Sequence, residues 1–193
     1  VAQAPVESRS PSAPAALGTF VAPRELVALG ERLLFNAFHP ALGQALWSTD
    51  PLSGAGDLLM EARPGFRGAS PSGLTVFNGA LYFVADDGDV GLELWRSDGS
   101  KAGTRLVKDI AAGPEASTPS FLTVFDGKLF FVARDGASGY RLWVTGGDTP
   151  TTLPVPGGES LLNPRQLTVV GSKLYFSATD RDTGHELWVL DGA

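Results

Sequence analysis

The sequence predicts an all-β fold, a four-bladed β-propeller whose blades are four-stranded antiparallel sheets. Three observations lead to this prediction. The chain repeats itself at a period near 48 residues, which is typical of propellers, solenoids and arrays. Each repeat contains four short apolar runs separated by turn residues, as expected for strands. The four tryptophans of the chain mark the period, at spacings of 48, 48 and 45 residues: Trp47, Trp95, Trp143 and Trp188.

The second repeat shows the four expected strands most clearly, at residues 74–77, 81–85, 92–96 and 104–110. The first two are joined by Asn78-Gly79, which suits a type I′ hairpin turn because that turn needs positive φ at both central residues. The other repeats carry hairpin dipeptides at the same place, with glycine first where a type II′ turn is expected. These dipeptides are Gly30-Glu31, Asp126-Gly127 and Gly171-Ser172.

The second strand of each repeat is apolar on both faces, for example LYFVA at 81–85 and LFFVA at 129–133. A strand with one face in water would alternate between apolar and polar residues, so these strands are covered on both sides. In the third strand, Leu94 and Trp95 point to opposite faces because side chains alternate along a strand. A four-stranded unit packed on both faces by its own copies is a propeller blade. No window shows helical periodicity, which excludes an α-solenoid, and the signatures of WD40 blades are not arranged as that family needs.

Residues 93–100 read Glu-Leu-Trp-Arg-Ser-Asp-Gly-Ser and are followed by Gly103-Thr104. This pattern resembles the ELW-x-x-DGT repeat of secreted or surface-attached bacterial proteins, prominently those of myxobacteria. The resemblance covers about residues 24–193, and only the second copy is complete. It implies an exported propeller-like protein, secreted, periplasmic or at the cell surface, and brings no established catalytic residues. The other copies are partial, with Ala45-Leu46-Trp47, Arg141-Leu142-Trp143 and Glu186-Leu187-Trp188 at the tryptophan.

We expect one propeller domain over residues 18–193, because each blade buries its faces only against its neighbours. Residues 1–17 are rich in Pro, Ser and Ala, which is typical of a flexible leader. They are also placed to supply the outer strand that the fourth repeat lacks. The outer strand of a blade lies three inter-strand gaps, about 14 Å in total, from the inner strand that starts near Arg24. The residues that follow a strand within 1–17 are numerous enough to cover this distance. The two residues between Thr19–Val21 and Arg24 span at most about 7 Å, so Thr19–Val21 cannot be that outer strand. The expected blades are about 24–70, 71–118, 119–163 and 164–193.

Closure by residues 1–17 of the same chain predicts a closed monomer, and closure by a second chain would give a homodimer. The net charge of −6 and the absence of a basic cluster argue against nucleic acid and anionic membrane surfaces as partners. No apolar run approaches the roughly 20 residues of a spanning helix, so membrane insertion is not expected. The chain has no cysteine, which excludes disulfides, thiolate metal sites and cysteine nucleophiles.

Four polar residues follow the prolines that begin the repeats, and they form the first candidate site: Arg24, Ser72, Ser120 and Arg165. If the ring closes, the two arginines become neighbours at the mouth of the channel and can hold an anion through forked hydrogen bonds. The alternative is that they pair with Glu25 and other rim carboxylates. His39 and His185 lie in or beside loops of the first and fourth repeats, and two imidazoles alone do not define a metal site.

Acidic residues gather in the loops between second and third strands. The run 180–186 has alternating carboxylates and a glycine, which is similar to a calcium loop but lacks the full ligand set. Asp and Gly are also what hairpin loops need, so the alternative to calcium binding is a structural turn. No other cofactor is expected. The candidate calcium ligands are Asp86, Asp87, Asp89, Asp180 and Asp182.

The four tryptophans could form a sugar-stacking platform, but each lies mid-strand beside a leucine, which favours a role in the core. The longer and more varied loops lie opposite the hairpin turns, and such loops commonly carry ligand sites. The first functional hypothesis is therefore a non-catalytic, exported binding or scaffold propeller that recognises a protein or glycan through this loop face. The alternative is a small metal-dependent hydrolase or lactonase-like propeller. No nucleophile motif is present, and the fold hosts both functions.

Overall fold

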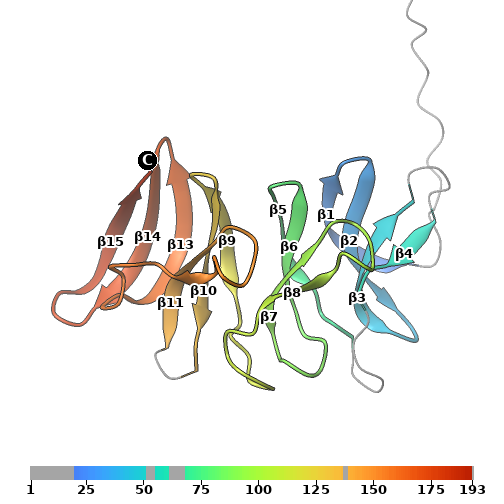
Figure 1. Ribbon diagram of the computed structural model, residues 1–193, viewed down its shortest axis with the longest axis horizontal. Coiled ribbons are helices and arrows are strands. Elements are labelled where there is room, and N and C mark those ends of the chain that lie inside the picture. Colours follow the sequence, from blue (N-terminus) through green and yellow to red (C-terminus); the bar gives the residue numbers. More distant parts are fainter. Residues whose placement is uncertain (1–19, 51–54, 61–67, 137–138, 193) are drawn as a thin grey trace, which may run out of the picture.

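A computed structural model describes residues 20–50, 55–60, 68–136 and 139–192. The described chain forms four antiparallel sheets that follow one another along the sequence and stand side by side (Figure 1). The prediction of an all-β fold with four propeller blades is confirmed. In the described residues, no helix is long and apolar enough to span a membrane.

Within each sheet the strands pair in sequence order, so every blade is a simple antiparallel meander. The first blade contains β1 (Val21–Leu29), β2 (Arg32–His39), β3 (Gly43–Thr49) and β4 (Gly56–Leu58). The second contains β5 (Ser72–Phe77), β6 (Ala80–Ala85), β7 (Glu93–Ser97) and β8 (Arg105–Lys108). The third contains β9 (Ser120–Phe125), β10 (Lys128–Arg134), β11 (Tyr140–Thr145) and β12 (Leu153–Pro154). The fourth contains β13 (Leu162–Val170), β14 (Lys173–Asp180) and β15 (Gly184–Asp191).

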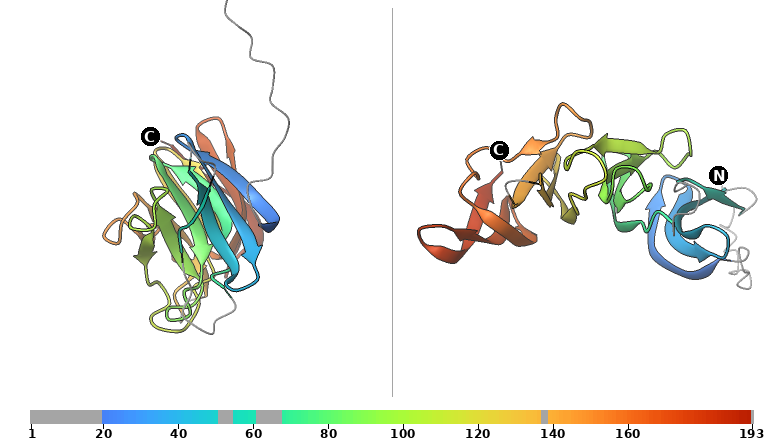
Figure 2. Two further views of the ribbon diagram at one scale, coloured as in Figure 1. Left: turned by 90° about the vertical axis from the view of Figure 1, so that its right-hand side faces the viewer. Right: turned by 90° about the horizontal axis from the view of Figure 1, so that it is seen from below.

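The blades lie along a crescent, with the first and fourth at opposite ends (Figure 2, right). The described residues therefore form an open arc of a propeller. The fourth sheet has three strands within the described residues, as the sequence predicted. The predicted closing strand falls in residues 1–17, which lie outside the described residues.

The hairpin turns between first and second strands have the predicted conformations. Asn78 and Gly79 have φ of 46° and 68°, and Asp126 and Gly127 have φ of 47° and 65°, so both turns have the two positive angles of type I′. Gly30 and Gly171 have φ of 59°, and the residue after each has negative φ, as type II′ requires. The dipeptides thus set the register of all four hairpins.

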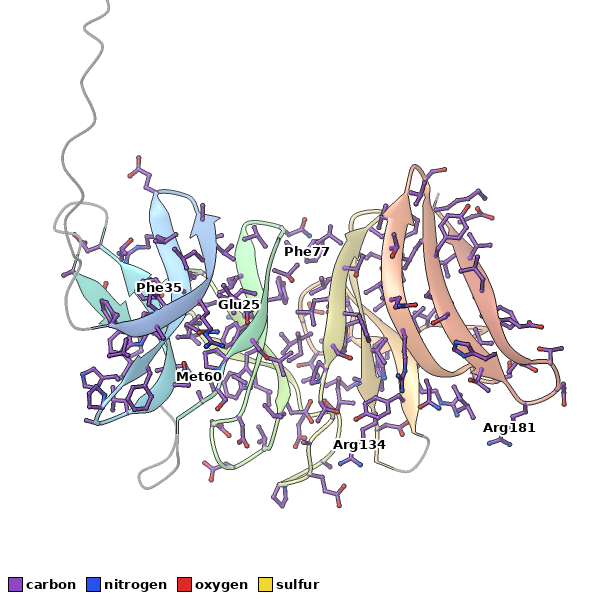
Figure 3. All side chains as sticks on the ribbon, turned by 180° about the vertical axis from the view of Figure 1, so that it is seen from behind. Glu25, Phe35, Met60, Phe77, Arg134 and Arg181 are labelled. Carbon is purple, nitrogen blue, oxygen red and sulfur yellow. The ribbon has the colours of Figure 1, made fainter. Side chains whose placement is uncertain are left out.

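The core lies between the blades. Leu94 packs in one cluster with Phe131 and Trp143 of the third blade, whereas Trp95 packs in another with Leu34 and Leu46 of the first. The opposite orientations predicted for Leu94 and Trp95 are therefore confirmed. Figure 3 shows the side chains that fill these spaces, with Met60 between the first and second sheets and Phe77 between the second and third.

Three tryptophans occupy equivalent positions in their blades, and each makes the same kind of hydrogen bond. The indole Nε1 of Trp47, Trp95 and Trp143 donates to the carbonyl oxygen ten residues earlier, in Ala37, Ala85 and Ala133. All three side chains are buried. A buried indole needs such an acceptor, since an unpaired N–H in the core is costly. The core role is confirmed for these three tryptophans, so they do not form a sugar-stacking platform.

Candidate functional site

Each inner strand begins with the same irregular backbone. The residue before the proline of the repeat and the residue two positions after it both have positive φ. For a residue other than glycine this conformation costs about 1–2 kcal/mol, so it persists only where the surrounding structure fixes it. The pairs and their angles are Ala22 (49°) and Glu25 (50°), Ser70 (46°) and Gly73 (67°), Thr118 (45°) and Phe121 (55°), and Asn163 (50°) and Gln166 (58°).

These conformations produce bulges around the residue that follows the proline. The register of β1 with β2 shifts on both sides of Arg24, and that of β13 with β14 shifts on both sides of Arg165. Bulges re-aim side chains and are common beside binding sites. Arg24, Ser72, Ser120 and Arg165 therefore occupy one structural position, repeated once per blade.

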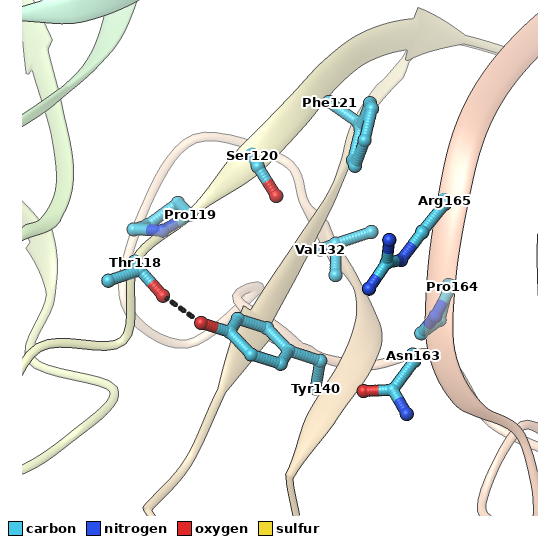
Figure 4. Close-up of a pocket in the computed structure, with 9 residues that line it drawn as sticks. All are labelled: Thr118, Pro119, Ser120, Phe121, Val132, Tyr140, Asn163, Pro164 and Arg165. Atoms are coloured by element: carbon cyan, nitrogen blue, oxygen red, sulfur yellow. Dashed lines mark hydrogen bonds between the residues drawn. The ribbon is translucent and has the colours of Figure 1, made fainter.

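A pocket of about 470 Å³ lies between the third and fourth blades, where the bulged starts of β9 and β13 face each other (Figure 4). Its size is in the range of small-molecule sites. The lining side chains come from both blades and include one cation, three hydroxyls, one amide and two aromatic rings. They belong to Thr118, Pro119, Ser120, Phe121, Val132, Tyr140, Asn163, Pro164 and Arg165.

The polar groups of this pocket are held at fixed places. The hydroxyls of Tyr140 and Thr118 are 2.7 Å apart and share a hydrogen bond, which holds the Tyr140 ring against the wall of the pocket. Arg165 extends from β13 into the space facing β9 (Figure 4). Its guanidinium makes no hydrogen bond or ion pair with another residue that the structure describes. Phe121, with 45% of its surface exposed, offers an aromatic face in the same pocket.

Of the four residues in the first candidate site, the structure brings together Ser120 and Arg165. Ser72 and Arg24 occupy the same position in the second and first blades, farther along the crescent. Arg24 and Arg165 belong to the blades at its opposite ends, so the described arc does not bring the four around one channel mouth. The carboxylate of Glu25 accepts a hydrogen bond from the backbone N–H of Leu74, 3.0 Å away. That contact ties the first blade to the second.

The two histidines are also in blades at opposite ends. His39 Nδ1 accepts a hydrogen bond from the backbone N–H of Ala41, and its ring lies 5.7 Å from that of Trp47. His185 Nδ1 lies 3.3 Å from the hydroxyl of Thr179. Each imidazole therefore contacts residues of its own blade, and the arc does not bring the two histidines together.

The acidic loops form side-chain-to-backbone turns. Asp86 accepts a hydrogen bond from the N–H of Gly88 at 2.7 Å, and the N–H groups of Asp89 and Asp182 donate to Asp87 and Asp180, each at 2.9 Å. These contacts are the ones that the structural-turn interpretation expects. In the described parts of the chain, no group of three or more His, Asp or Glu side chains is arranged to hold a metal ion. Calcium binding by these loops stays a prediction.

Sequence reasoning missed Phe121, Tyr140 and Asn163 as pocket residues. Phenylalanine disfavours positive φ, so nothing in the sequence indicates the turn that places Phe121 in the pocket. Asn163 alone is of a residue type that tolerates this conformation, and its place before Pro164 was the one available signal. Tyr140 reaches the pocket from the third strand, across a pairing that the sequence pattern does not specify.

No family model matches this chain, and no curated protein matches it either. Among solved structures it is similar to puromycin hydrolase, with a TM-score of 0.57 and 18% identity over 89% of this chain and 27% of that one. It is also similar to TolB from Acinetobacter baumannii, with a TM-score of 0.48 and 15% identity over 83% of this chain and 38% of that one. The chain thus spans about a quarter of puromycin hydrolase. At this identity the likeness to puromycin hydrolase shows the fold alone, and it agrees with the propeller.

Proposed function

We propose that the chain is a non-catalytic binding module that holds an acidic glycan in the pocket between the third and fourth blades. The observation that carries this proposal is the Arg165 guanidinium, which faces a pocket of about 470 Å³ without a described partner of its own. A guanidinium presents a planar fork of N–H donors that matches a carboxylate with two parallel hydrogen bonds. An acidic group of the ligand would complete this pairing.

The other lining residues favour a sugar over a carboxylate side chain of a protein. Ser120 and Asn163 add hydroxyl and amide groups that can both donate and accept hydrogen bonds, as the hydroxyls of a sugar need. Phe121 offers an exposed aromatic face for the apolar side of a sugar ring. A convergent set of this kind, one charge with a few neutral polar groups and an aromatic wall, is typical of small-ligand sites.

The residues with positive φ at the pocket also support a role in ligand binding. Thr118, Phe121 and Asn163 all line it and all have positive φ, so the backbone around the ligand is fixed before binding. A preformed site loses little conformational entropy when the ligand enters, which improves affinity. This pocket lies where the crossovers between blades enter β9 and β13, at the loops that the sequence favours for ligand binding.

The proposed setting is outside the cytoplasm, secreted, periplasmic or at the cell surface, and it rests on the resemblance to the ELW-x-x-DGT repeat. The metal-dependent hydrolase or lactonase-like alternative stays a prediction. The likeness to puromycin hydrolase does not support that alternative, because at 18% identity it concerns the fold alone.

A glycan array that pairs each uronic-acid oligosaccharide with its neutral counterpart tests the proposal. We expect binding to the acidic member of at least one pair and little binding to the neutral member. Equal binding to both members would contradict the role of Arg165. Binding to acidic peptides but to no glycan would assign the pocket to a protein partner instead.

A further inference from the structure

One leucine per blade occupies the position directly before the tryptophan, and its exposure changes abruptly in the last blade. Leu46 and Leu94 are 0% exposed and Leu142 is 6% exposed, whereas Leu187 is 74% exposed. The first three are covered by the next blade along the arc. Leu187 has the same place in its sheet but no described residue covers it.

The exposed leucine belongs to one face of the fourth blade, the open face, which carries the large residues Val170, Tyr175, Leu187 and Val189 together with the hydroxyl of Ser177. Strand pairing places Tyr175 beside Val189 and Ser177 beside Leu187, so these side chains share one side of the sheet. Val170 and Val189 are 60% and 49% exposed. A groove of about 510 Å³ on this face is lined by Gln166, Thr168, Tyr175, Phe176, Ser177 and Leu187.

In the other three blades the equivalent surface is covered in the same way each time. The second strand of the covering blade presents Leu-x-Phe-x-Ala and its third strand presents the tryptophan. For example, Phe131 and Trp143 of the third blade pack in one cluster with Tyr82 and Leu94 of the second. The covering residues are Leu81, Phe83, Ala85 and Trp95; then Leu129, Phe131, Ala133 and Trp143; then Leu174, Phe176, Ala178 and Trp188.

A glycine in the turn after the third strand completes this contact. The carbonyl of Gly99 accepts a hydrogen bond from Ser48 of the preceding blade, and the carbonyl of Gly147 accepts one from Arg96. A Cβ atom on Gly147 would overlap the hydroxyl of Tyr82, so the close approach requires glycine. The partner that fits such a surface is therefore a blade with Leu-x-Phe-x-Ala, a tryptophan and this glycine.

A second copy of the described chain has no such surface to offer. The tryptophan faces of its second, third and fourth blades are already buried inside the arc. On its first blade, the ring of Phe20 lies 5.2 Å from that of Phe35 and 4.9 Å from that of Trp47. Trp47 is consequently 7% exposed, close to the 9% of Trp95 in an internal interface. Phe20 acts as a cap, a device that repeat proteins need at a terminal unit.

We propose that the open face binds a further blade of this same repeat, which lays its tryptophan and its Leu-x-Phe-x-Ala strand against Leu187 and Tyr175. The contact repeats the three internal interfaces and removes the apolar surface of β14 and β15 from water. Phe20 caps the first blade, whereas no described residue caps the fourth, so the open face is the surface available to a further blade.

An extended chain tests this proposal, with residues 100–158 joined directly after Gly192 in place of Ala193. The junction keeps the repeat in register, because Asp191-Gly192 corresponds to Asp98-Gly99, which precedes Ser100. The added segment supplies an outer strand for the fourth blade and then a complete blade with its tryptophan. We expect hydrogen exchange of β14 and β15 to slow by about tenfold or more, because β15 ceases to be an edge strand and the docked blade covers the open face of both strands.

The added outer strand alone would also protect β15, so a pair of variants separates strand pairing from docking. In the extended chain, Leu187→Asp should remove most of the protection of β14 while leaving the chain folded. The matched control Leu153→Asp changes a leucine that is 51% exposed in β12, away from the open face, and should leave exchange unchanged.

Two results would overturn the proposal. One is exchange of β14 that is equally slow in the extended chain with and without Leu187→Asp. The other is a dimer of the original chain, twice 20.2 kDa by light scattering, that Leu187→Asp dissociates, because the open face would then bind a second copy.

Discussion

The hydroxyl of Ser117 donates a hydrogen bond of 2.5 Å to the carboxylate of Glu93, whose side chain is completely buried. The backbone N–H groups of Ala111 and Ser117 donate to the other oxygen of the same carboxylate, at 3.1 and 3.2 Å. Glu93 lies on β7, and its three donors belong to the crossover that leads to the third blade. One buried carboxyl thus fixes the path of that crossover.

Replacing Glu93 by glutamine should change how stability depends on pH. Burial raises the pKa of Glu93 from its ordinary 4.5, and the hydrogen bonds from Ser117 and Ala111 offset part of that rise. A group whose folded-state pKa is raised contributes stability below its unfolded pKa and loses it as pH rises through the folded value. Relative to Glu93→Gln, the wild-type chain should therefore lose stability from about pH 4.5 upward. Urea unfolding of both chains between pH 4 and 8 measures this, and a constant difference across the range would contradict it.

Replacing Trp95 by alanine should cost about 3–5 kcal/mol of unfolding free energy, as for other large buried aromatics. The side chain packs between the first and second blades, and its Nε1 donates to the Ala85 carbonyl at 3.0 Å. Trp188→Ala is the matched comparison and should cost less, because Trp188 is half-buried and its Nε1 has no hydrogen-bond partner among the described residues. Denaturant unfolding checks both. A cost below about 1 kcal/mol for Trp95→Ala would contradict its role in the core.

Replacing Gly147 by alanine should destabilise the chain more than replacing Gly136. Both glycines have positive φ, 120° and 84°, so both substitutions incur a backbone cost of about 1–2 kcal/mol. A Cβ at Gly136 meets open space, whereas one at Gly147 meets the hydroxyl of Tyr82 in the second blade. Overpacking of this kind adds about 1–3 kcal/mol. Equal losses for the two variants in thermal unfolding would show that the turn does not press against Tyr82.

Millimolar calcium should leave the melting temperature unchanged. Asp86, Asp87 and Asp180 already accept hydrogen bonds from backbone N–H groups of their own loops. Hydrogen bonds from the backbone of Asp182, the side chain of Ser160 and the backbone of Thr183 lower the pKa of Asp180, so groups of the protein itself stabilise its charged form. A ligand that binds only the native state raises its stability by mass action. A rise of several degrees, reversed by EDTA, would instead support calcium binding by these loops.

The strands and hairpins could be predicted because they depend on local residue patterns. Asn78-Gly79 specifies its turn by backbone preference alone, and the opposite burial of Leu94 and Trp95 follows from the alternation of side chains. The curvature of the arc was not predictable in this way. It depends on how far each blade turns against the next, which sets whether Arg24 and Arg165 meet, and the two remain at opposite ends.

Some residues of the candidate pocket could be predicted from the sequence pattern and others could not. Ser120 and Arg165 were found because they repeat at a fixed distance after a proline. Phe121 enters the pocket because its backbone has positive φ, and Tyr140 enters it through packing between strands. Neither feature can be predicted from the residue type. The cap formed by Phe20 was not predicted, because Phe20 lies before the first repeat and outside its pattern.

Calorimetric titration of the acidic oligosaccharide selected on the array tests the central claim, that Arg165 holds a carboxylate between the third and fourth blades. Arg165→Ala should weaken binding by about tenfold or more, since it removes a charge-assisted pair of hydrogen bonds. Arg24→Ala is the matched control, because Arg24 has the same position in the first blade but does not line the pocket. We expect wild-type affinity for Arg24→Ala and loss of affinity for Arg165→Ala. Equal affinity of the two variants would contradict it.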